Sequence, residues 1–234
     1  MPLRPRPTGL DAVDRMLGGG FPQGRLSEIA GEAGRGCTSL ALALLAHTTA
    51  SGAWAAMLDP ADAFDPLSAD AAGVDLARVL WARPRGLEEA LRCAEHVLTA
   101  HGFALLVLDL APGTSQQAPR VPDAAWPRLR RSAAGTDTAL VVLGQQRLAG
   151  SCADVAVELE STRTHFLPRP DWLAGRDTRL SLVRNRMGPA DLHAHVGWRM
   201  PGALESPLHE ATPQAFQHSA RAQALGRPRP ERAA

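Results

Sequence analysis

Nine residues near the N-terminus have the spacing of a phosphate-binding loop. Gly31–Ser39 is GEAGRGCTS, in which Gly31 is followed by four residues, Gly36, one further residue and Thr38. In such loops, backbone N–H groups surround the phosphates, a lysine after the second glycine reaches the terminal phosphates, and the Ser/Thr hydroxyl binds Mg²⁺. Here Cys37 occupies the lysine position. Because a thiol is short and normally neutral, the loop lacks the main electrostatic attraction for terminal phosphates.

The basic residues of the chain are all arginines. Lys and Arg total 25 in the sequence, and none of them is Lys. A drift of the genome from lysine to arginine codons explains most of this bias. It also means that no other segment can supply a lysine to the loop.

Three interpretations of the loop are open. In the first, which we favour, Gly31, Gly34 and Gly36 only shape a strand-to-helix turn. In the second, backbone N–H groups and Thr38, helped by Arg35, bind a phosphate weakly. In the third, the loop supports ATP hydrolysis. We interpret Cys37 as a small residue in a cramped turn, although a helix N-terminus can also make a thiol reactive. The degenerate loop comprises Gly31, Gly34, Arg35, Gly36, Cys37, Thr38 and Ser39.

Alternating strand and helix patterns surround this loop. Strands are predicted at 25–31, 54–60, 103–110 and 138–147, and helices at 38–52 and 87–102. A short helix ending in a glycine turn is predicted at 9–24, a loop at 113–127, and alternating strands at 155–162 and 178–187. We therefore predict an α/β fold, with a mostly parallel sheet flanked by helices and an antiparallel extension.

Length, charge and cysteine usage fit one α/β domain in a reducing compartment. The chain has 234 residues, a net charge of +1 and three scattered cysteines, with no long apolar run. We expect no membrane span, no secretory signal and a cytoplasmic protein. No metal site is expected, because His193 and His195 have no third ligand near them in sequence. Near-neutral charge favours DNA binding that is weak or occurs through partners.

The order of these segments resembles the RecA core. The run TGLDAVDRMLGGGFPQGRLSEIAG (8–31) is similar to the opening of that family. AAMLDPADAFDP, GVDLARVL, FALLVLDL, ALVVLGQQR and LSLVRNRMGP follow in the RecA order. The resemblance covers roughly Pro7 to Pro201. It implies a RecA-like core domain at 1–200, and we expect a flexible Pro/Ala/Arg-rich tail at 201–234.

The resemblance also implies which functional residues are kept and which are lost. Cys37 replaces the phosphate-loop lysine, and the place of the catalytic glutamate falls on Ala61, with Asp62 one residue further along. The metal-side (Walker B) aspartate is kept as Asp109, and the sensing glutamine as Gln145. We therefore expect no catalytic residue and no cofactor, with weak ATP/Mg binding as the open alternative.

Two arginine groups are candidates for contact with DNA or protein. Arg184 and Arg186 correspond to the basic pair by which a RecA protomer reaches its neighbour's nucleotide. The second group could contact DNA phosphates while its tryptophan stacks on a base, although a solvated helix face is an equal alternative. That group comprises Trp126, Arg128, Arg130 and Arg131.

A RecA core with shortened DNA-binding loops and no polymerising N-terminal arm resembles the ImuA branch and its SulA-like relatives. That resemblance implies a non-catalytic accessory of SOS-induced translesion DNA synthesis. The candidate partners are an ImuB-like Y-family polymerase subunit, RecA or a second copy of the chain, and the tail is a candidate second contact. The alternatives are a RecA-family ATPase with a deviant Walker A loop and a SulA-like cell-division inhibitor.

Overall fold

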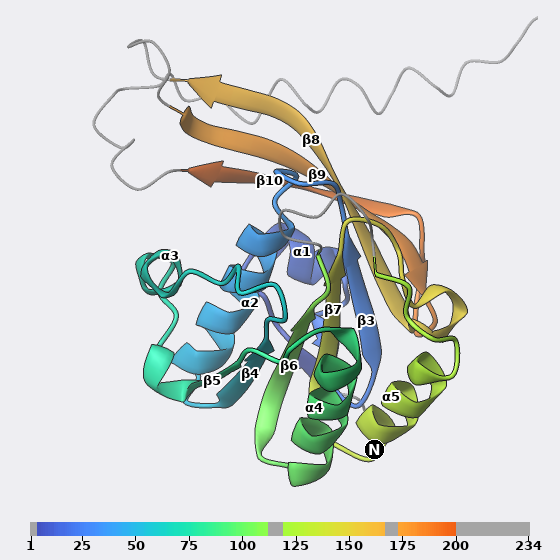
Figure 1. Cartoon of the computed structure of the whole chain (residues 1–234). Coiled ribbons are helices and arrows are strands. Elements are labelled where there is room, and N and C mark those ends of the chain that lie inside the picture. The colour runs from blue at the N-terminus through green and yellow to red at the C-terminus, as the bar shows by residue number, and fades with distance from the viewer. Residues whose placement is uncertain (1–3, 112–118, 167–172, 200–234) are drawn as a thin grey trace, which may run out of the picture.

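One mixed sheet carries the fold. The computed structural model describes residues 4–111, 119–166 and 173–199, and the predicted tail at 201–234 lies outside them. The eight strands of the sheet have the spatial order β10-β9-β8-β3-β7-β6-β4-β5 (Figure 1). In chain order they are β3 (Leu26–Ala30), β4 (Trp54–Leu58), β5 (Val79–Ala82), β6 (Phe103–Asp109), β7 (Ala139–Gly144), β8 (Val155–Phe166), β9 (Leu173–Asn185) and β10 (Leu192–Arg199).

The sheet is parallel from β8 to β5 and antiparallel beyond β8. β3 pairs in parallel with both β7 and β8, whereas β9 runs antiparallel to β8 and to β10. A small antiparallel sheet of β1 (Pro5–Arg6) and β2 (Phe21–Pro22) lies near the N-terminus. The predicted fold class, a mostly parallel sheet with an antiparallel extension, is confirmed.

Helices cover both faces of the sheet (Figure 1). One face is covered by α1, α2 and α3, and the opposite face by α4 and α5. The helices are α1 (Asp11–Met16), α2 (Cys37–Ala50), α3 (Pro66–Ala71), α4 (Leu87–Ala100) and α5 (Ala125–Ala134), with short 3₁₀ turns η1 (Leu76–Arg78) and η2 (Gly150–Cys152). None of the helices in the described ranges has both the length and the apolar character that a membrane span requires.

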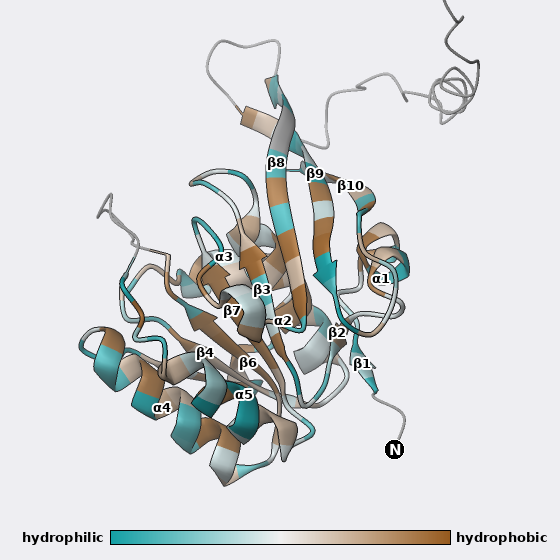
Figure 2. Cartoon of the chain, turned by 90° about the vertical axis from the view of Figure 1, so that its right-hand side faces the viewer, coloured by the Kyte–Doolittle hydropathy of each residue, from teal (hydrophilic) through white to brown (hydrophobic). Residues whose placement is uncertain are grey.

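The alternation of side chains along the strands explains why both faces need cover. In β6, Leu105 and Val107 belong to the core under α2, and Leu106 and Leu108 to the core under α4 and α5. All four are fully buried. Figure 2 shows these central strands as hydrophobic and the outward sides of α4 and α5 as hydrophilic. A continuous apolar strand therefore buries its side chains on both faces of the sheet, as is typical of parallel sheets.

One predicted boundary is wrong. The expected loop at 113–127 ends earlier, because α5 already begins at Ala125. Pro127 lies in the first turn of this helix, where its missing N–H has no intrahelical partner to lose. The residues 112–118 of that predicted loop lie outside the described part of the chain.

The antiparallel extension projects past the core strands. β8 pairs with β3 only from Val155 to Glu158 and continues to Phe166 paired with β9. Figure 1 shows the outer halves of β8, β9 and β10 above the end of β3, where the phosphate loop begins. Side chains from this extension can therefore reach the loop.

Candidate phosphate-binding site

The candidate loop lies at the carboxyl end of a central strand. β3 has β7 on one side and β8 on the other, and the loop joins its end to α2. The N–H of Gly31 donates to the carbonyl of Gly144 on β7, at 3.1 Å. Gly34 and Gly36 have φ of 77° and 104°, conformations that side chains disfavour. The glycine spacing thus fixes the turn, and the carboxyl edge of a parallel sheet is where ligands usually bind.

The N-terminus of α2 is open to an anion. Its N-cap residue is Gly36, which has no side chain to accept from the first N–H groups, and no acidic residue lies in the first turn. The N–H groups of the first turn have no intrahelical acceptor, and the helix dipole adds partial positive charge there. Thr38 places its hydroxyl in the same turn.

A cavity of about 490 Å³ opens in front of this helix end. The loop and the first turn of α2 form one wall, and the ends of β6 and β7 form another. The start of β9 and the end of β10 cover it from the extension side. Its volume lies in the range of small-molecule sites. Thr38, Asp109 and Gln145 all line it, so predicted residues from three separate segments of the chain are brought together.

Cys37 contributes a neutral side chain. Its Sγ lies 3.7 Å from the carbonyl oxygen of Gly31. Burial, and second the carboxylate of Asp109, raise the pKa of this thiol to about 12. A pKa raised in this way argues against the alternative of a reactive thiol, since a reactive cysteine needs a lowered pKa. Position 37 supplies neither the charge nor the length of the missing lysine.

Asp109 ends β6 at the cavity wall. It is 8% exposed, and its Oδ1 accepts from the N–H of Ala111 at 2.9 Å. Burial, with a further contribution from the charge of Asp59, raises its pKa to about 6. The carboxylate is thus mostly ionised at neutral pH. Thr38 and Asp109 are the side-chain types that hold Mg²⁺ in P-loop proteins, so this half of the site fits a metal-bound phosphate.

The segment after β4 presents no carboxylate to the cavity. Ala61 and Asp62 do not line it, whereas Ala63 does. The Asp62 side chain is 61% exposed and lies 3.4 Å from the guanidinium of Arg83. Asp59 is fully buried and accepts from the N–H groups of Ala63 and Phe64. Asp62 therefore points toward Arg83 and away from the place of a water-orienting group.

The interpretation of the loop as a weak phosphate-binding site requires Arg35 to face the cavity. Arg35 does not do so. Its Nη2 lies 2.7 Å from Oε2 of Glu32, and it lines a neighbouring hollow with Gln146 and Glu158. The carbonyl of Arg35 accepts from the Thr178 hydroxyl on β9 at 3.1 Å. The expectation that Arg35 helps to bind phosphate is corrected, because a glutamate three residues earlier in the chain holds its guanidinium.

Among the described residues, Arg176 is the arginine that lines the cavity, and no pattern in the sequence predicts it. It lies on β9, lines the cavity, and brings its Nη1 to 3.0 Å from the point where a Cβ on Gly34 would be. Trp198 on β10 also lines the cavity, close to Gly36, and its Nε1 donates to the Thr178 hydroxyl at 3.1 Å. No local pattern marks Arg176, since 140 residues separate it from Gly36 (176 − 36).

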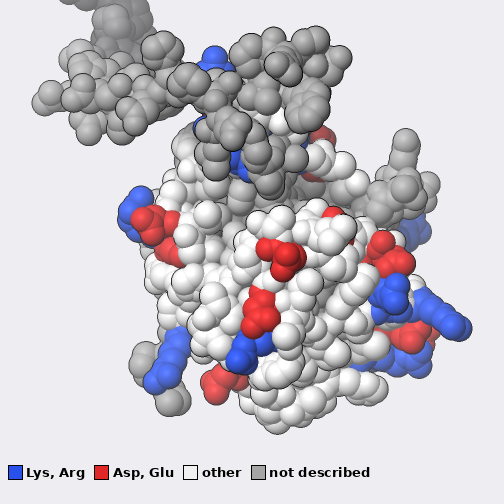
Figure 3. Space-filling view, turned by 90° about the vertical axis from the view of Figure 1, so that its left-hand side faces the viewer, with Lys and Arg blue, Asp and Glu red and all other residues white. Residues whose placement is uncertain are grey.

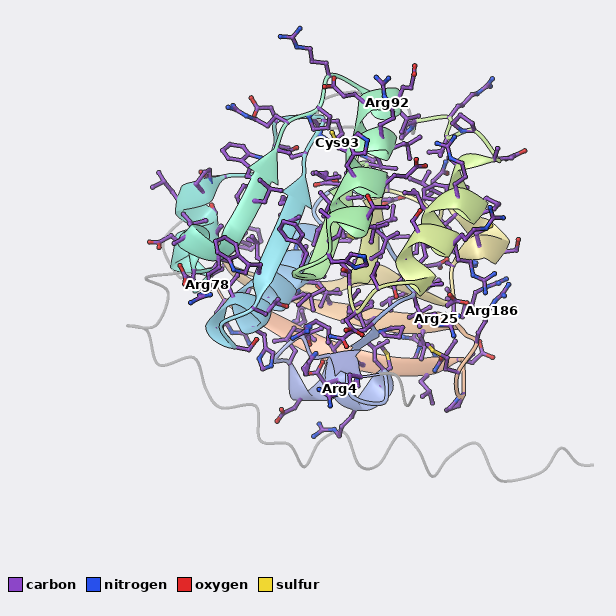
Figure 4. The ribbon with its side chains drawn as sticks, turned by 90° about the horizontal axis from the view of Figure 1, so that it is seen from below. Arg4, Arg25, Arg78, Arg92, Cys93 and Arg186 are labelled. Atoms are coloured by element: carbon purple, nitrogen blue, oxygen red, sulfur yellow. The ribbon has the colours of Figure 1, made fainter. Side chains whose placement is uncertain are left out.

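The two predicted arginine groups meet at one place. Arg184 and Arg186 both donate to the carbonyl of Ser151, at 3.3 and 2.5 Å. Arg130 reaches Oδ1 of Asp154 at 2.9 Å, and Arg186 Nε lies 3.9 Å from the same oxygen. Arg130, Arg184 and Arg186 therefore form one arginine cluster around Ser151 and Asp154. Figure 4, seen from below, shows Arg186 pointing outward from this end of the sheet.

The other members of the second group do not join the cluster. Trp126 is 4% exposed and packs in the core under α5, so its expected stacking on a DNA base is wrong. Arg128 pairs with Glu95 of α4 at 2.8 Å. Arg131 is exposed. Helical spacing explains the difference, because Trp126, Leu129 and Ala133 form the buried side of α5.

Fold and site together define an α/β protein of the P-loop class with an altered phosphate loop. The family model of the RecA N-terminal domain matches residues 3–119, and the chain belongs to the RecA family.

The curated relatives agree with this assignment. Protein RecA of Picosynechococcus sp. is 38% identical over 103 residues, which are 44% of this chain and 30% of that protein. Protein RecA of Methylococcus capsulatus is 27% identical over 213 residues, covering 78% of this chain and 61% of the relative. The chain thus spans less than two thirds of the length of these relatives.

A solved structure has the same fold. The crystal structure of the RadB recombinase superposes with a TM-score of 0.61 at 22% identity, covering 81% of this chain and 94% of that one. The RecA part of the predicted resemblance is therefore confirmed.

Proposed function

We propose that this chain is a non-catalytic accessory of SOS-induced translesion DNA synthesis, of the ImuA type, which acts by binding proteins. Its partners would be an ImuB-like Y-family polymerase subunit, RecA and a second copy of the chain. The observation that carries the proposal is the state of the phosphate loop in a chain with a RecA fold. A neutral thiol replaces the lysine, and no carboxylate after β4 faces the cavity.

These two losses affect the groups that hydrolysis needs most. Phosphoryl transfer depends on cations that neutralise the terminal phosphate and on a group that orients the attacking water. Loss of one such group commonly costs a factor of a hundred or more in rate, on the order of 10² to 10³ for a single oxyanion donor. A chain that has the RecA fold without these two groups is better suited to a binding role than to ATP hydrolysis.

The arginine cluster is the surface we assign to RecA or to a second copy. Arg130, Arg184 and Arg186 carry three positive charges around the single buried carboxylate of Asp154. The excess positive charge suits an acidic protein surface, and exposed charges raise the rate of association more than the affinity. Net charge near zero over the whole chain makes the cluster a local feature.

The β5 edge of the sheet, as the described residues form it, is the surface we assign to the polymerase subunit. β5 ends the sheet, and Leu80 on it is 43% exposed. Three more large apolar side chains are exposed in the segments around β5 in the sequence, namely Trp54 of β4 by 49%, Leu67 of α3 by 81% and Leu76 of η1 by 37%. Figure 3 shows this side of the molecule as largely uncharged. An apolar edge strand can accept a strand or a helix from another protein.

Purified components test the proposal. Binding to RecA, to the polymerase subunit and to the chain itself is measured by biolayer interferometry, and phosphate release from Mg-ATP is measured beside RecA. The Arg184→Glu/Arg186→Glu variant should lose the contact with RecA or with a second copy. Leu80→Glu should weaken the contact with the polymerase subunit.

Arg92→Glu is the matched control. Arg92 is an exposed arginine of α4, on a different side of the molecule from Arg186 (Figure 4). ATP turnover near that of RecA would replace the proposal with the ATPase alternative. Binding to the tubulin-like division protein, with none to RecA or the polymerase subunit, would replace it with the division-inhibitor alternative.

A further inference from the structure

Strand β10 forms one end of the large sheet. Among the described residues it pairs with β9 alone, in an unbroken register from Leu192 opposite Leu182 to Arg199 opposite Gly175 (Figure 1). Proteins protect long edge strands with prolines, lysines or bulges, or cover them with another segment. The sequence of β10, LHAHVGWR, has no proline and no lysine, and its pairing with β9 has no bulge. Cover by another segment is therefore the protection that fits this edge.

The two faces of β10 differ in character. Ala194 and Val196 are 5% and 8% exposed and belong to the core under α1. His195 and Arg199 lie on the opposite face and are exposed. The guanidinium of Arg199 lies 3.5 Å from Asp177 of β9, and its five N–H donors allow it to bind a second carboxylate. A strand that covers this edge therefore needs apolar side chains on one face and an acidic one on the other.

The chain continues from β10 into a segment that can turn back along it. The residues that follow Arg199 are MPGALESPLH (200–209). Pro201 and Gly202 are typical of turns, because proline fixes φ and glycine permits positive φ. β8, β9 and β10 already lie side by side as antiparallel strands, and consecutive strands are usually neighbours in space. The place of 200–209 in the chain therefore favours it as the segment next to β10.

The side chains of this segment match the two faces of β10. In an extended conformation, Leu204 and Leu208 share one face and Glu205 lies on the other. The two leucines can extend the apolar face of β10, while Glu205 comes to the face of Arg199. Pro207 has no N–H to donate, and proline within sheets is found on outermost strands. A proline in the covering strand would also protect the new edge.

We propose that residues 204–209 pair antiparallel with β10 as a further strand of the large sheet, with Glu205 opposite Arg199 and Leu208 opposite Val196. A short loop joins the two strands. The added strand covers the edge at which a second copy of the chain would otherwise pair. The inference goes beyond the proposed accessory role and does not depend on it.

The proposed register defines a cross-strand pair for a disulfide test. It places Pro207 opposite Gly197 and His209 opposite His195. Since proline cannot donate to β10, its pair is a non-hydrogen-bonded one, and the pair two residues further along is of the same kind. The Cα atoms of such pairs are about 4.5 Å apart, a distance that a disulfide can span.

The full chain with His195→Cys and His209→Cys tests the pairing. We expect an intramolecular disulfide under mild oxidation, detected by peptide mass spectrometry without reduction. The matched control is His195→Cys with His218→Cys, because position 218 lies outside the proposed strand. The disulfide should form about tenfold faster or more in the first variant, since pairing raises the effective concentration of the two thiols.

Amide hydrogen exchange of the full chain tests the cover of β10 without new cysteines. Leu208→Asp should speed exchange of the outward N–H groups of β10 about tenfold or more, because loss of the pairing opens them to water. Leu225→Asp makes the same change elsewhere in the tail and should leave the exchange of β10 as in the wild type. Circular dichroism checks that both variants fold.

Three results would overturn the inference. One is disulfide formation at the same rate in the two cysteine variants. Another is equal exchange of β10 in the wild type and in folded Leu208→Asp. The third is a disulfide between two chains of His195→Cys/His209→Cys, which would assign the β10 edge to a second copy. None of these results bears on the contacts with RecA or the polymerase subunit.

Discussion

The carboxylate of Asp109 lies close enough to Cys37 to raise the pKa of its thiol, adding to the larger effect of burial. The two groups stand where a P-loop protein has an oppositely charged pair, a lysine and an aspartate. In this chain the loop side of that pair is neutral at every physiological pH.

Cys37 should therefore be almost inert to alkylation. With a pKa of about 12, the thiolate fraction at pH 8 is roughly a thousandfold below that of an ordinary cysteine. We expect iodoacetamide at pH 8 to label Cys37 far more slowly than a free thiol in solution. Peptide mass spectrometry of the folded chain measures this rate, and labelling at the rate of a free thiol would contradict the neutral state.

Asp109→Asn should stabilise the fold at pH 8 and leave it unchanged near pH 3. The pKa of Asp109 is raised to about 6 in the folded state, so the folded chain keeps a proton that the unfolded chain loses near pH 4. The stabilisation that comes from this bound proton of Asp109 is fully present below about pH 4 and is lost as the pH rises through 6. A shift of this size corresponds to about 3 kcal/mol at most.

Denaturant unfolding at the two pH values measures the Asp109 effect. The exposed Asp123, changed to Asn, is the control and should show no such difference. An Asp109→Asn variant that is less stable than the wild type at pH 8 would contradict the raised pKa.

Asp59→Asn and Asp62→Asn should differ sharply although they are three residues apart. Asp59 is fully buried, and its two oxygens accept from Ala63 and Phe64 at 3.0 and 2.8 Å. An amide leaves one of these N–H groups without an acceptor, which should lower the free energy of unfolding by about 2–4 kcal/mol. Loss of the exposed pair between Asp62 and Arg83 should cost about 0–1 kcal/mol. Equal effects in urea unfolding would refute the structural role of Asp59.

Trp126→Ala should act on stability and not on DNA binding. Removal of a buried aromatic side chain typically costs about 3–5 kcal/mol. Arg131→Ala, an exposed change on the same helix, should stay within about 0.5 kcal/mol of the wild type. Thermal unfolding and a fluorescence titration with single-stranded DNA check both statements. DNA affinity that falls with folded Trp126→Phe would restore the stacking role that burial argues against.

The sequence is sufficient for the parts of the site that lie within one short segment or at the end of a predicted strand. Gly31, Gly36 and Thr38 mark the turn, and Asp109 and Gln145 are placed because strand ends of a parallel sheet meet at one edge. The alternation of strands and helices along the chain, and with it the mostly parallel sheet, is likewise predicted from the apolar patterns. Short-range periodicity is the physical basis for predicting the strands and the residues at their ends.

Contacts across the sheet extension could not be predicted in this way. Arg176 reaches Gly34 because the β8–β9 pairing places it there, and that register depends on tertiary packing. The pairing of Arg35 with Glu32 depends on a side-chain rotamer that no pattern fixes. The arginine neighbours of Trp126 favour a surface position, although helical spacing with Leu129 places it inside.

The hydrogen bond from Thr178 to the carbonyl of Arg35 ties the projecting strands to the loop. By thermodynamic reciprocity, if a molecule bound at β9 changes the affinity of the loop for a ligand, that ligand changes the affinity of β9 for the molecule by the same factor. Through this contact, the loop and the projecting strands would each respond to a ligand of the other.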